Sequence, residues 1–87
     1  MRYVATFEHE EAGGFSVVFP DLPGCQTCGE TLEEAKAMAA DALEGWLAVT
    51  LEAGEAPPRP QAVDGIAIKV PSELHARLRA CWSTVKL

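Results

Sequence analysis

Two short segments near the start of the chain alternate between apolar and polar positions, which is the period of a β-strand. Residues 2–8 place three apolar side chains on one face, namely Tyr3, Ala5 and Phe7. Residues 15–19 repeat the pattern with Phe15, Val17 and Phe19. The polar stretch HEEAGG lies between them and ends in two glycines, which suit a tight turn. The pattern predicts an antiparallel hairpin with one strongly apolar face.

The stretch PDLPG at residues 20–24 interrupts this alternation. Its prolines lack the amide hydrogen that a sheet ladder needs, and its glycine permits turn conformations. Residues 25–30 have the sequence CQTCGE, and we expect them to form a third, less regular strand.

A long helix is predicted to follow, because Thr31 and Glu34 form a capping box and Gly54 supplies a stop. Between them, apolar residues recur at helical spacing: Leu32, Ala35, Ala39, Leu43, Trp46 and Thr50. Four more widen the stripe beyond one sheet face: Met38, Ala42, Leu47 and Val49. Two interpretations stay open, a helix lying deep in a small core or a second surface for a partner or another copy.

A proline-rich linker, residues 57–61, precedes a fourth alternating segment, GIAIKVP. A final amphipathic helix opens at Pro71 and Ser72, with an apolar face of Leu74, Leu78, Cys81, Trp82 and Val85. The predicted order is β-β-β-α-β-α, an α+β fold with one long helix on one face of the sheet and a short C-terminal helix. We expect a single domain over residues 1–87, with a core of 1–56 and a C-terminal strand and helix at 64–87.

Composition and charge narrow the functional classes. The chain has 87 residues, enough for one domain, and no apolar run approaches a membrane span, so we expect a cytoplasmic protein. Its formal net charge of −6 disfavours direct nucleic-acid binding by this chain alone. The acidity suits a basic protein partner or serves solubility alone. A domain this small has a thin core, and we expect a homodimer or larger assembly.

Two cysteines three positions apart, Cys25 and Cys28, raise the question of a metal or redox site. A structural zinc site needs about four converging ligands, usually as two close pairs, and the chain has only one such pair. On a strand, an offset of three points the two side chains to opposite faces. We therefore expect no metal and no cofactor, with Cys25 a small buried residue and Cys28 partly exposed; their redox sensitivity stays open. No nucleophile elbow or phosphate loop is present, so an enzyme is not expected.

The stretch from Tyr3 to Pro58 resembles the N-terminal domain of the HicB antitoxin family. The features that match are the glycine-rich turn in EEAGGFSVVF, the motif PDLPGC, Gly29 before TLEEA, the long helix and EAGEAPPRP. Position 28 is usually polar in that family, so the cysteine there departs from its pattern.

This resemblance implies a partial RNase H-like fold, with a mixed sheet and one long helix across a face. It also implies a partner, a small basic RNA-cleaving toxin of the HicA type, which the antitoxin neutralises. RNase H chemistry needs carboxylates on several elements, but the fourth strand has none and Glu8 lies only at the end of the first. The resemblance thus predicts a binding module without catalytic activity.

Three functions remain in competition. The first is toxin neutralisation; the second is a truncated ribbon-helix-helix DNA-binding autoregulator, because IAIKVPSELHARL resembles the start of such a unit, although basic residues there are few and dispersed. The third is a stand-alone oligomeric family member of unknown ligand.

For the first function we expect the proline turn and the start of the helix to contact the partner, through Asp21, Leu22, Pro23, Glu33 and Glu34. The alternative for Leu22 is a lid over the core. For self-association we expect an interface that includes Trp46, Leu47 and Trp82.

Overall fold

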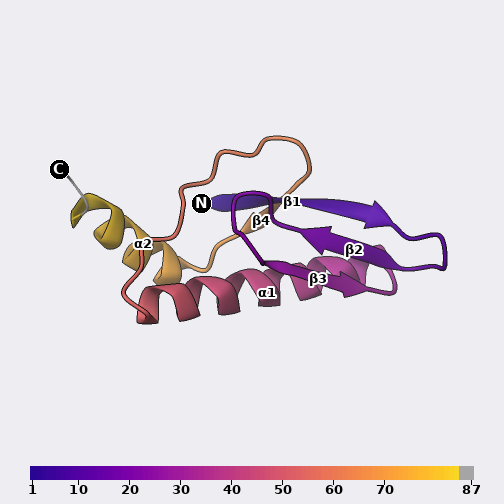
Figure 1. Cartoon of the computed structure of the whole chain (residues 1–87), viewed down its shortest axis with the longest axis horizontal. Coiled ribbons are helices and arrows are strands. Elements are labelled where there is room, and N and C mark those ends of the chain that lie inside the picture. The colour runs from indigo at the N-terminus through magenta and orange to yellow at the C-terminus, as the bar shows by residue number, and fades with distance from the viewer. Residues whose placement is uncertain (85–87) are drawn as a thin grey trace.

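The computed structural model describes residues 1–84 and has the predicted element order. The strands are β1 (Arg2–His9), β2 (Phe15–Val18), β3 (Gln26–Gly29) and β4 (Ile66–Lys69), and the helices are α1 (Leu32–Glu52) and α2 (Ser72–Thr84). The α+β layout, with one long helix on the sheet and a short C-terminal helix, is confirmed (Figure 1). The predicted helix position Val85 and the end of the C-terminal segment lie outside the described residues.

The four strands form one sheet in the order β3-β2-β1-β4. The three neighbouring pairs are all antiparallel, so the mixed sheet implied by the resemblance is wrong for the described strands. The reason is the path of the chain: α1 and the linker bring β4 back to the free side of β1, where Tyr3 pairs with Ile68. The segment IAIKV therefore completes the sheet of its own domain.

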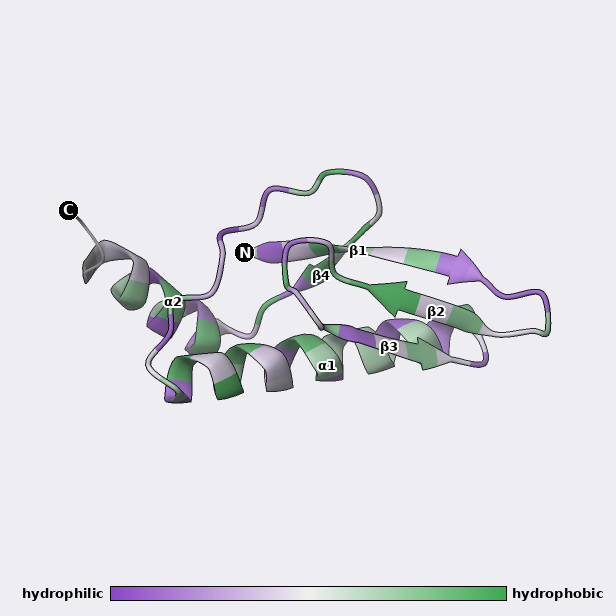
Figure 2. Ribbon diagram, in the orientation of Figure 1, coloured by the Kyte–Doolittle hydropathy of each residue, from purple (hydrophilic) through white to green (hydrophobic). Residues whose placement is uncertain are grey.

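The core lies between one face of the sheet and α1 (Figure 2). Strand residues on that face are Tyr3, Ala5, Val17 and Ile68, all buried. The buried line of the helix runs at intervals of four: Ala35, Ala39, Leu43 and Leu47. This line shares Ala35, Ala39 and Leu43 with the predicted stripe but continues through Leu47, while Trp46 and Thr50 are half-buried and Leu32, the first residue of the helix, is exposed. Of the four residues that widen the stripe, Leu47 is in the core, Ala42 is half-buried against it, and Met38 and Val49 are exposed.

Both ends of α1 use the local chemistry that the sequence predicts. The Thr31 side chain accepts a hydrogen bond from the Glu34 amide at 3.0 Å. The Glu34 carboxylate accepts from the Glu30 amide at 2.6 Å, one residue before the position of a standard capping box. At the other end, Gly54 has φ +81° and donates to Leu51, while the amide of Glu55 donates to Thr50. These two bonds form a Schellman motif and end the helix.

Gly29 allows α1 to begin directly against β3. A Cβ atom at this position would lie 2.5 Å from the amide nitrogen and 2.6 Å from the Cα of Ala35. Real Cβ atoms essentially never come so close to backbone, so only glycine lets the first turn of the helix contact the strand at this distance. The glycine before TLEEA is therefore a packing requirement of the fold.

Candidate partner-binding surface

The PDLPG segment forms two consecutive turns over the core. The amide of Leu22 donates to the carbonyl of Phe19, and the amide of Cys25 donates to that of Leu22, both at 3.0 Å. Leu22 is only 1 % exposed, because its side chain is packed into the core. Pro23, next to it, is exposed.

Asp21 holds the linker that follows α1. Its Oδ2 atom accepts hydrogen bonds from the amides of Gln61 at 2.8 Å and Ala62 at 2.9 Å. Of the predicted contact residues in this turn, Leu22 is thus a core residue, as the alternative interpretation had it. Asp21 is engaged within the chain. Of these three residues, Pro23 is the one whose side chain is exposed and makes no hydrogen bond within the chain. The turn therefore has a structural role, and its contact with a partner stays a prediction.

The two tryptophans and Leu47 also have roles inside the chain. Leu47 is fully buried against the sheet, which removes it from the predicted oligomer interface. Trp46 is half-buried and donates from Nε1 to the carbonyl of Pro23 at 3.0 Å. Trp82 donates from Nε1 to the carbonyl of Pro57 at 2.7 Å, and the Arg59 guanidinium lies 4.9 Å from its ring centre, a cation–π distance.

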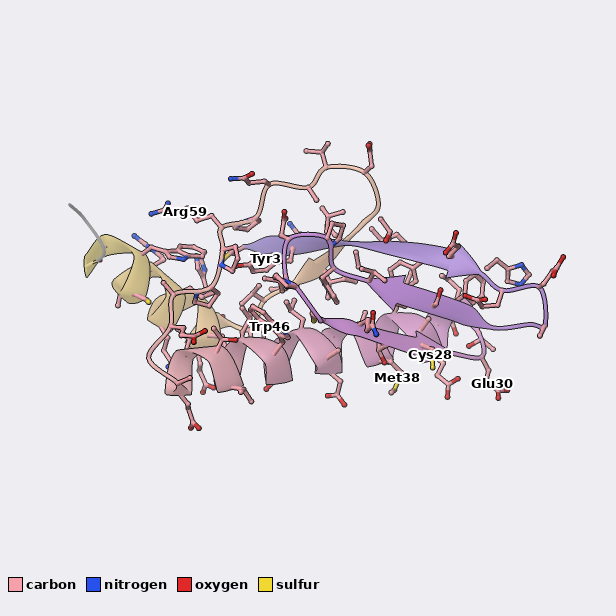
Figure 3. The ribbon with its side chains drawn as sticks, in the orientation of Figure 1. Tyr3, Cys28, Glu30, Met38, Trp46 and Arg59 are labelled. Atoms are coloured by element: carbon pink, nitrogen blue, oxygen red, sulfur yellow. The ribbon has the colours of Figure 1, made fainter. Side chains whose placement is uncertain are left out.

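Tyr3 lies where the sheet, the proline turn and the linker meet. Its hydroxyl donates to the carbonyl of Pro58, and its ring is fully buried (Figure 3). Burial, with a smaller effect from the negative charge of Asp21, raises the pKa of Tyr3 to about 12. The unfolded chain therefore loses this proton first, and stability falls as the pH rises from about 10 through about 12.

Tyr3 is the only tyrosine, so phenolate absorbance in an alkaline titration should report it directly, with a pKa near 12. Asp21→Asn should lower that pKa slightly, because the smaller of its two causes is removed. The same change should weaken the two linker hydrogen bonds by about 1–3 kcal/mol in total, since they involve a charged acceptor at a partly exposed site. Tyr3→Phe should remove the phenolate signal and flatten the alkaline loss of stability. An ordinary pKa near 10 for Tyr3 in the folded chain would contradict this arrangement.

The acidic residues gather at the hairpin end of the molecule. Between Tyr3 and Ala35 the chain has seven carboxylates and no lysine or arginine. Six of the seven lie at the β1–β2 turn or at the start of α1: Glu8, Glu10, Glu11, Glu30, Glu33 and Glu34. Glu33 and Glu34 are both exposed in the first turn of α1. Among residues 1–84, Lys36 is the lysine or arginine nearest in sequence to this acidic group.

The cations lie mostly toward the opposite end of a molecule that measures 47 × 20 × 19 Å. Arg2 pairs with Lys69 across β1 and β4, and Arg59 lies beside α2 (Figure 3). Arg77 and Arg79 are exposed on α2 itself. The opposite end is therefore mixed in charge, because Glu52, Glu55 and Glu73 accompany these cations, while the hairpin end is almost purely acidic.

A hollow of about 820 Å³ opens at the acidic end, between the β1–β2 turn, β3 and the start of α1. Its apolar lining includes Phe15, Met38 and the Cys28 side chain, and its carboxylates come from Glu10, Glu30 and Glu34. Figure 3 shows Cys28, Met38 and Glu30 together at this end. An apolar hollow with an acidic rim fits an apolar side chain flanked by cations.

The two cysteines near β3 point apart. Cys25 is buried and its thiol lies 3.7 Å from the carbonyl oxygen of Ala42; burial raises its pKa to about 11. Cys28 is exposed on the strand, so both expectations about burial are confirmed. Within residues 1–84, no group of three or more His, Cys, Asp or Glu side chains is placed to hold a metal ion. In the same range, neither helix has the length and apolarity that crossing a bilayer requires.

Comparison with known proteins places this architecture in a family. Residues 3–78 match the family model described as the HicB-like antitoxin of bacterial toxin–antitoxin systems. The chain belongs to the HicB-like antitoxin family. Two curated relatives from Photorhabdus laumondii subsp. laumondii, Antitoxin HicB 2 and Antitoxin HicB 1, are each 40 % identical over 78 residues, or 90 % of this chain. The match covers 55 % and 50 % of those relatives, so the chain spans about half of their length.

Membership of the HicB-like family agrees with the resemblance found in the motifs PDLPGC and TLEEA. Sequence reasoning predicted Glu33 and Glu34 as part of an acidic surface, and both lie on it. It missed the hollow, because Phe15 and Met38 come from separate elements and were assigned to the hairpin face and the helix stripe. The signal that would have helped is the absence of any lysine or arginine from residues 3–35.

Proposed function

We propose that the chain is an antitoxin-type binding module that neutralises a small, basic, RNA-cleaving toxin of the HicA type by protein–protein contact. The observation that supports it best is the hairpin end, which carries six carboxylates, three of which (Glu10, Glu30 and Glu34) line an apolar hollow. Family membership supports the antitoxin role. Opposite charge would speed the encounter with a basic protein and disfavour acidic partners, while buried apolar contacts would provide most of the affinity.

We propose that the chain acts in the cytoplasm and has no catalytic role. The RNase H-like character of the fold stays a prediction, and β4 contains no carboxylate for metal-assisted hydrolysis. A ribbon-helix-helix unit would need its strand free to pair with a second copy, whereas β4 is paired with β1. Self-association also stays a prediction, and its interface would have to lie away from Leu47.

The test is binding to a small basic protein of the HicA type, taken from the adjacent reading frame where that frame encodes one, and measured across a salt series. We expect the association rate to fall as salt rises, because the steering charges are screened. Glu33→Lys should slow association several-fold. Glu52→Lys makes the same charge change on an exposed residue at the far end of α1 and should leave the rate nearly unchanged. Absence of binding at every salt concentration would rule out the antitoxin function for this pair.

A further inference from the structure

One edge of the sheet is open and unprotected. β3 is an edge strand, and its residues Gln26–Gly29 include no proline and no charged side chain. Natural edge strands are usually blunted by lysine, proline or a covering segment. The opposite edge, β4, has the exposed charge of Lys69. In the part of the chain that the structure describes, β3 pairs only with β2.

An exposed apolar line on α1 runs beside this open edge. Met38, Ala42, Gly45 and Val49 follow one another at intervals of three and four, so they share one flank of the helix. Met38 is 40 % and Val49 69 % exposed. The flank faces the β3 side, because Met38 lines the hollow with Cys28, and the carbonyl of Ala42 lies against the thiol of Cys25. A strand laid along β3 would place alternate side chains on this line and in the hollow.

The charges near β3 distinguish between two molecules that could pair with this edge, a second copy of the chain and a basic segment of another protein. A second copy pairing through β3 would bring a second edge that carries the same carboxylates, Glu30, Glu34 and Asp41, and few cations to match them. No lysine or arginine lies on β2 or β3, and Lys36 is the only one on α1. Like charges would therefore face each other without compensation, while a cationic strand would find carboxylates along its path.

We propose that β3 is a strand-addition site, at which an extended basic segment of the partner pairs with Gln26–Gly29 and inserts an apolar side chain against Phe15 and Met38. This inference rests on the proposed function and specifies how the partner is held. Main-chain hydrogen bonds supply affinity in this mode, and the hollow with its carboxylates supplies selectivity.

The probe is a short acetylated peptide of alternating arginine and valine, followed by amide hydrogen exchange on the whole chain. We expect the peptide, at millimolar concentration, to slow exchange of amides within Gln26–Gly29 and to leave Ala67 and Lys69 unchanged. A matched peptide of alternating glutamate and valine should have no effect. Met38→Lys should weaken the binding of the arginine peptide by about tenfold or more, because the change adds a cation and removes an apolar contact. Ala37→Lys, which makes the same charge change on an exposed neighbouring position, should alter binding by less than about twofold.

Two results would overturn the inference. The first is that millimolar arginine peptide leaves amide exchange in β3 unchanged. The second is that the β3 amides are already protected without peptide in a chain of doubled mass, which would place a second copy on the edge. Measuring both the binding of the basic partner protein and the protection of β3 distinguishes a failure of this inference from a failure of the proposed function. If the partner protein binds without protecting β3, strand addition is wrong and the antitoxin function stands. If it fails to bind while the peptide protects β3, the antitoxin function is wrong and the edge site stands.

Discussion

Leu22→Ala should lower the free energy of unfolding by about 2–5 kcal/mol, the range for removing a fully buried leucine side chain from a core. The side chain is 1 % exposed and lies in the same core cluster as Phe19 and Leu43. A chain of 87 residues has a total stability of about 4–13 kcal/mol, so the change would remove a large part of it. Urea unfolding followed by tryptophan fluorescence measures the effect, because Trp46 contacts the proline turn and Trp82 contacts the linker.

Pro23→Ala is the matched control, because Pro23 adjoins Leu22 in the same turn but is exposed. We expect its effect on stability to stay within about 0.5–1 kcal/mol. Comparing the two variants distinguishes a role for Leu22 in the core from a role in binding a partner. Were Leu22→Ala as mild as Pro23→Ala, with weakened partner binding at full stability, the turn would be an interface and the buried position of Leu22 would be wrong.

Gly29→Ala should destabilise the fold by about 1–3 kcal/mol, a typical cost of inserting an extra carbon into a packed site. The added Cβ would overlap the backbone of Ala35, which cannot move aside without displacing the first turn of α1. The helix would then separate from β3, and the hydrogen bond between Glu34 and the Glu30 amide would be strained. Thermal unfolding followed by circular dichroism should show a clearly lowered melting temperature.

Gly45→Ala provides the comparison within the same helix. Nothing lies within 4 Å of a Cβ atom at this position, so the added methyl group meets open space. Because alanine favours the helix more than glycine does, the change should stabilise the chain by up to about 1 kcal/mol. Equal changes in stability for Gly29→Ala and Gly45→Ala would contradict this prediction. They would show that the close approach of α1 to β3 does not affect stability.

The fold was largely predictable because its signals are local. Alternation defined β1 and β2, the Thr31 cap and Gly54 defined α1, and each of these depends on neighbours only a few residues away. The choice of Leu47 over Trp46 as the buried residue of the last turns could not be predicted, since both positions continue the stripe at helical spacing. Only the shape of the facing sheet decides between them.

The candidate site was predictable in its charge and unpredictable in its shape. Glu33 and Glu34 could be placed on the surface because a capped helix start is normally exposed. Asp21 was misjudged, because its partners are amides about 40 residues away in a linker without regular structure. The hydrogen bonds of Trp46 and Trp82 were not predicted either, since an apolar stripe does not reveal that each ring nitrogen reaches a distant carbonyl; their place in an oligomer interface stays a prediction.

The attachment of the linker has a consequence for which substitutions the chain tolerates. Tyr3, Trp46 and Trp82 donate to backbone carbonyls of Pro58, Pro23 and Pro57, and Asp21 accepts from backbone amides. In these hydrogen bonds every contributing side chain lies outside the linker, which contributes only main-chain atoms to them. Exposed linker side chains such as Gln61 and Val63 are free to vary without loss of these bonds. The three side chains that hold the linker, those of Tyr3, Asp21 and Trp82, are not, so the path of the linker depends on residues elsewhere in the sequence.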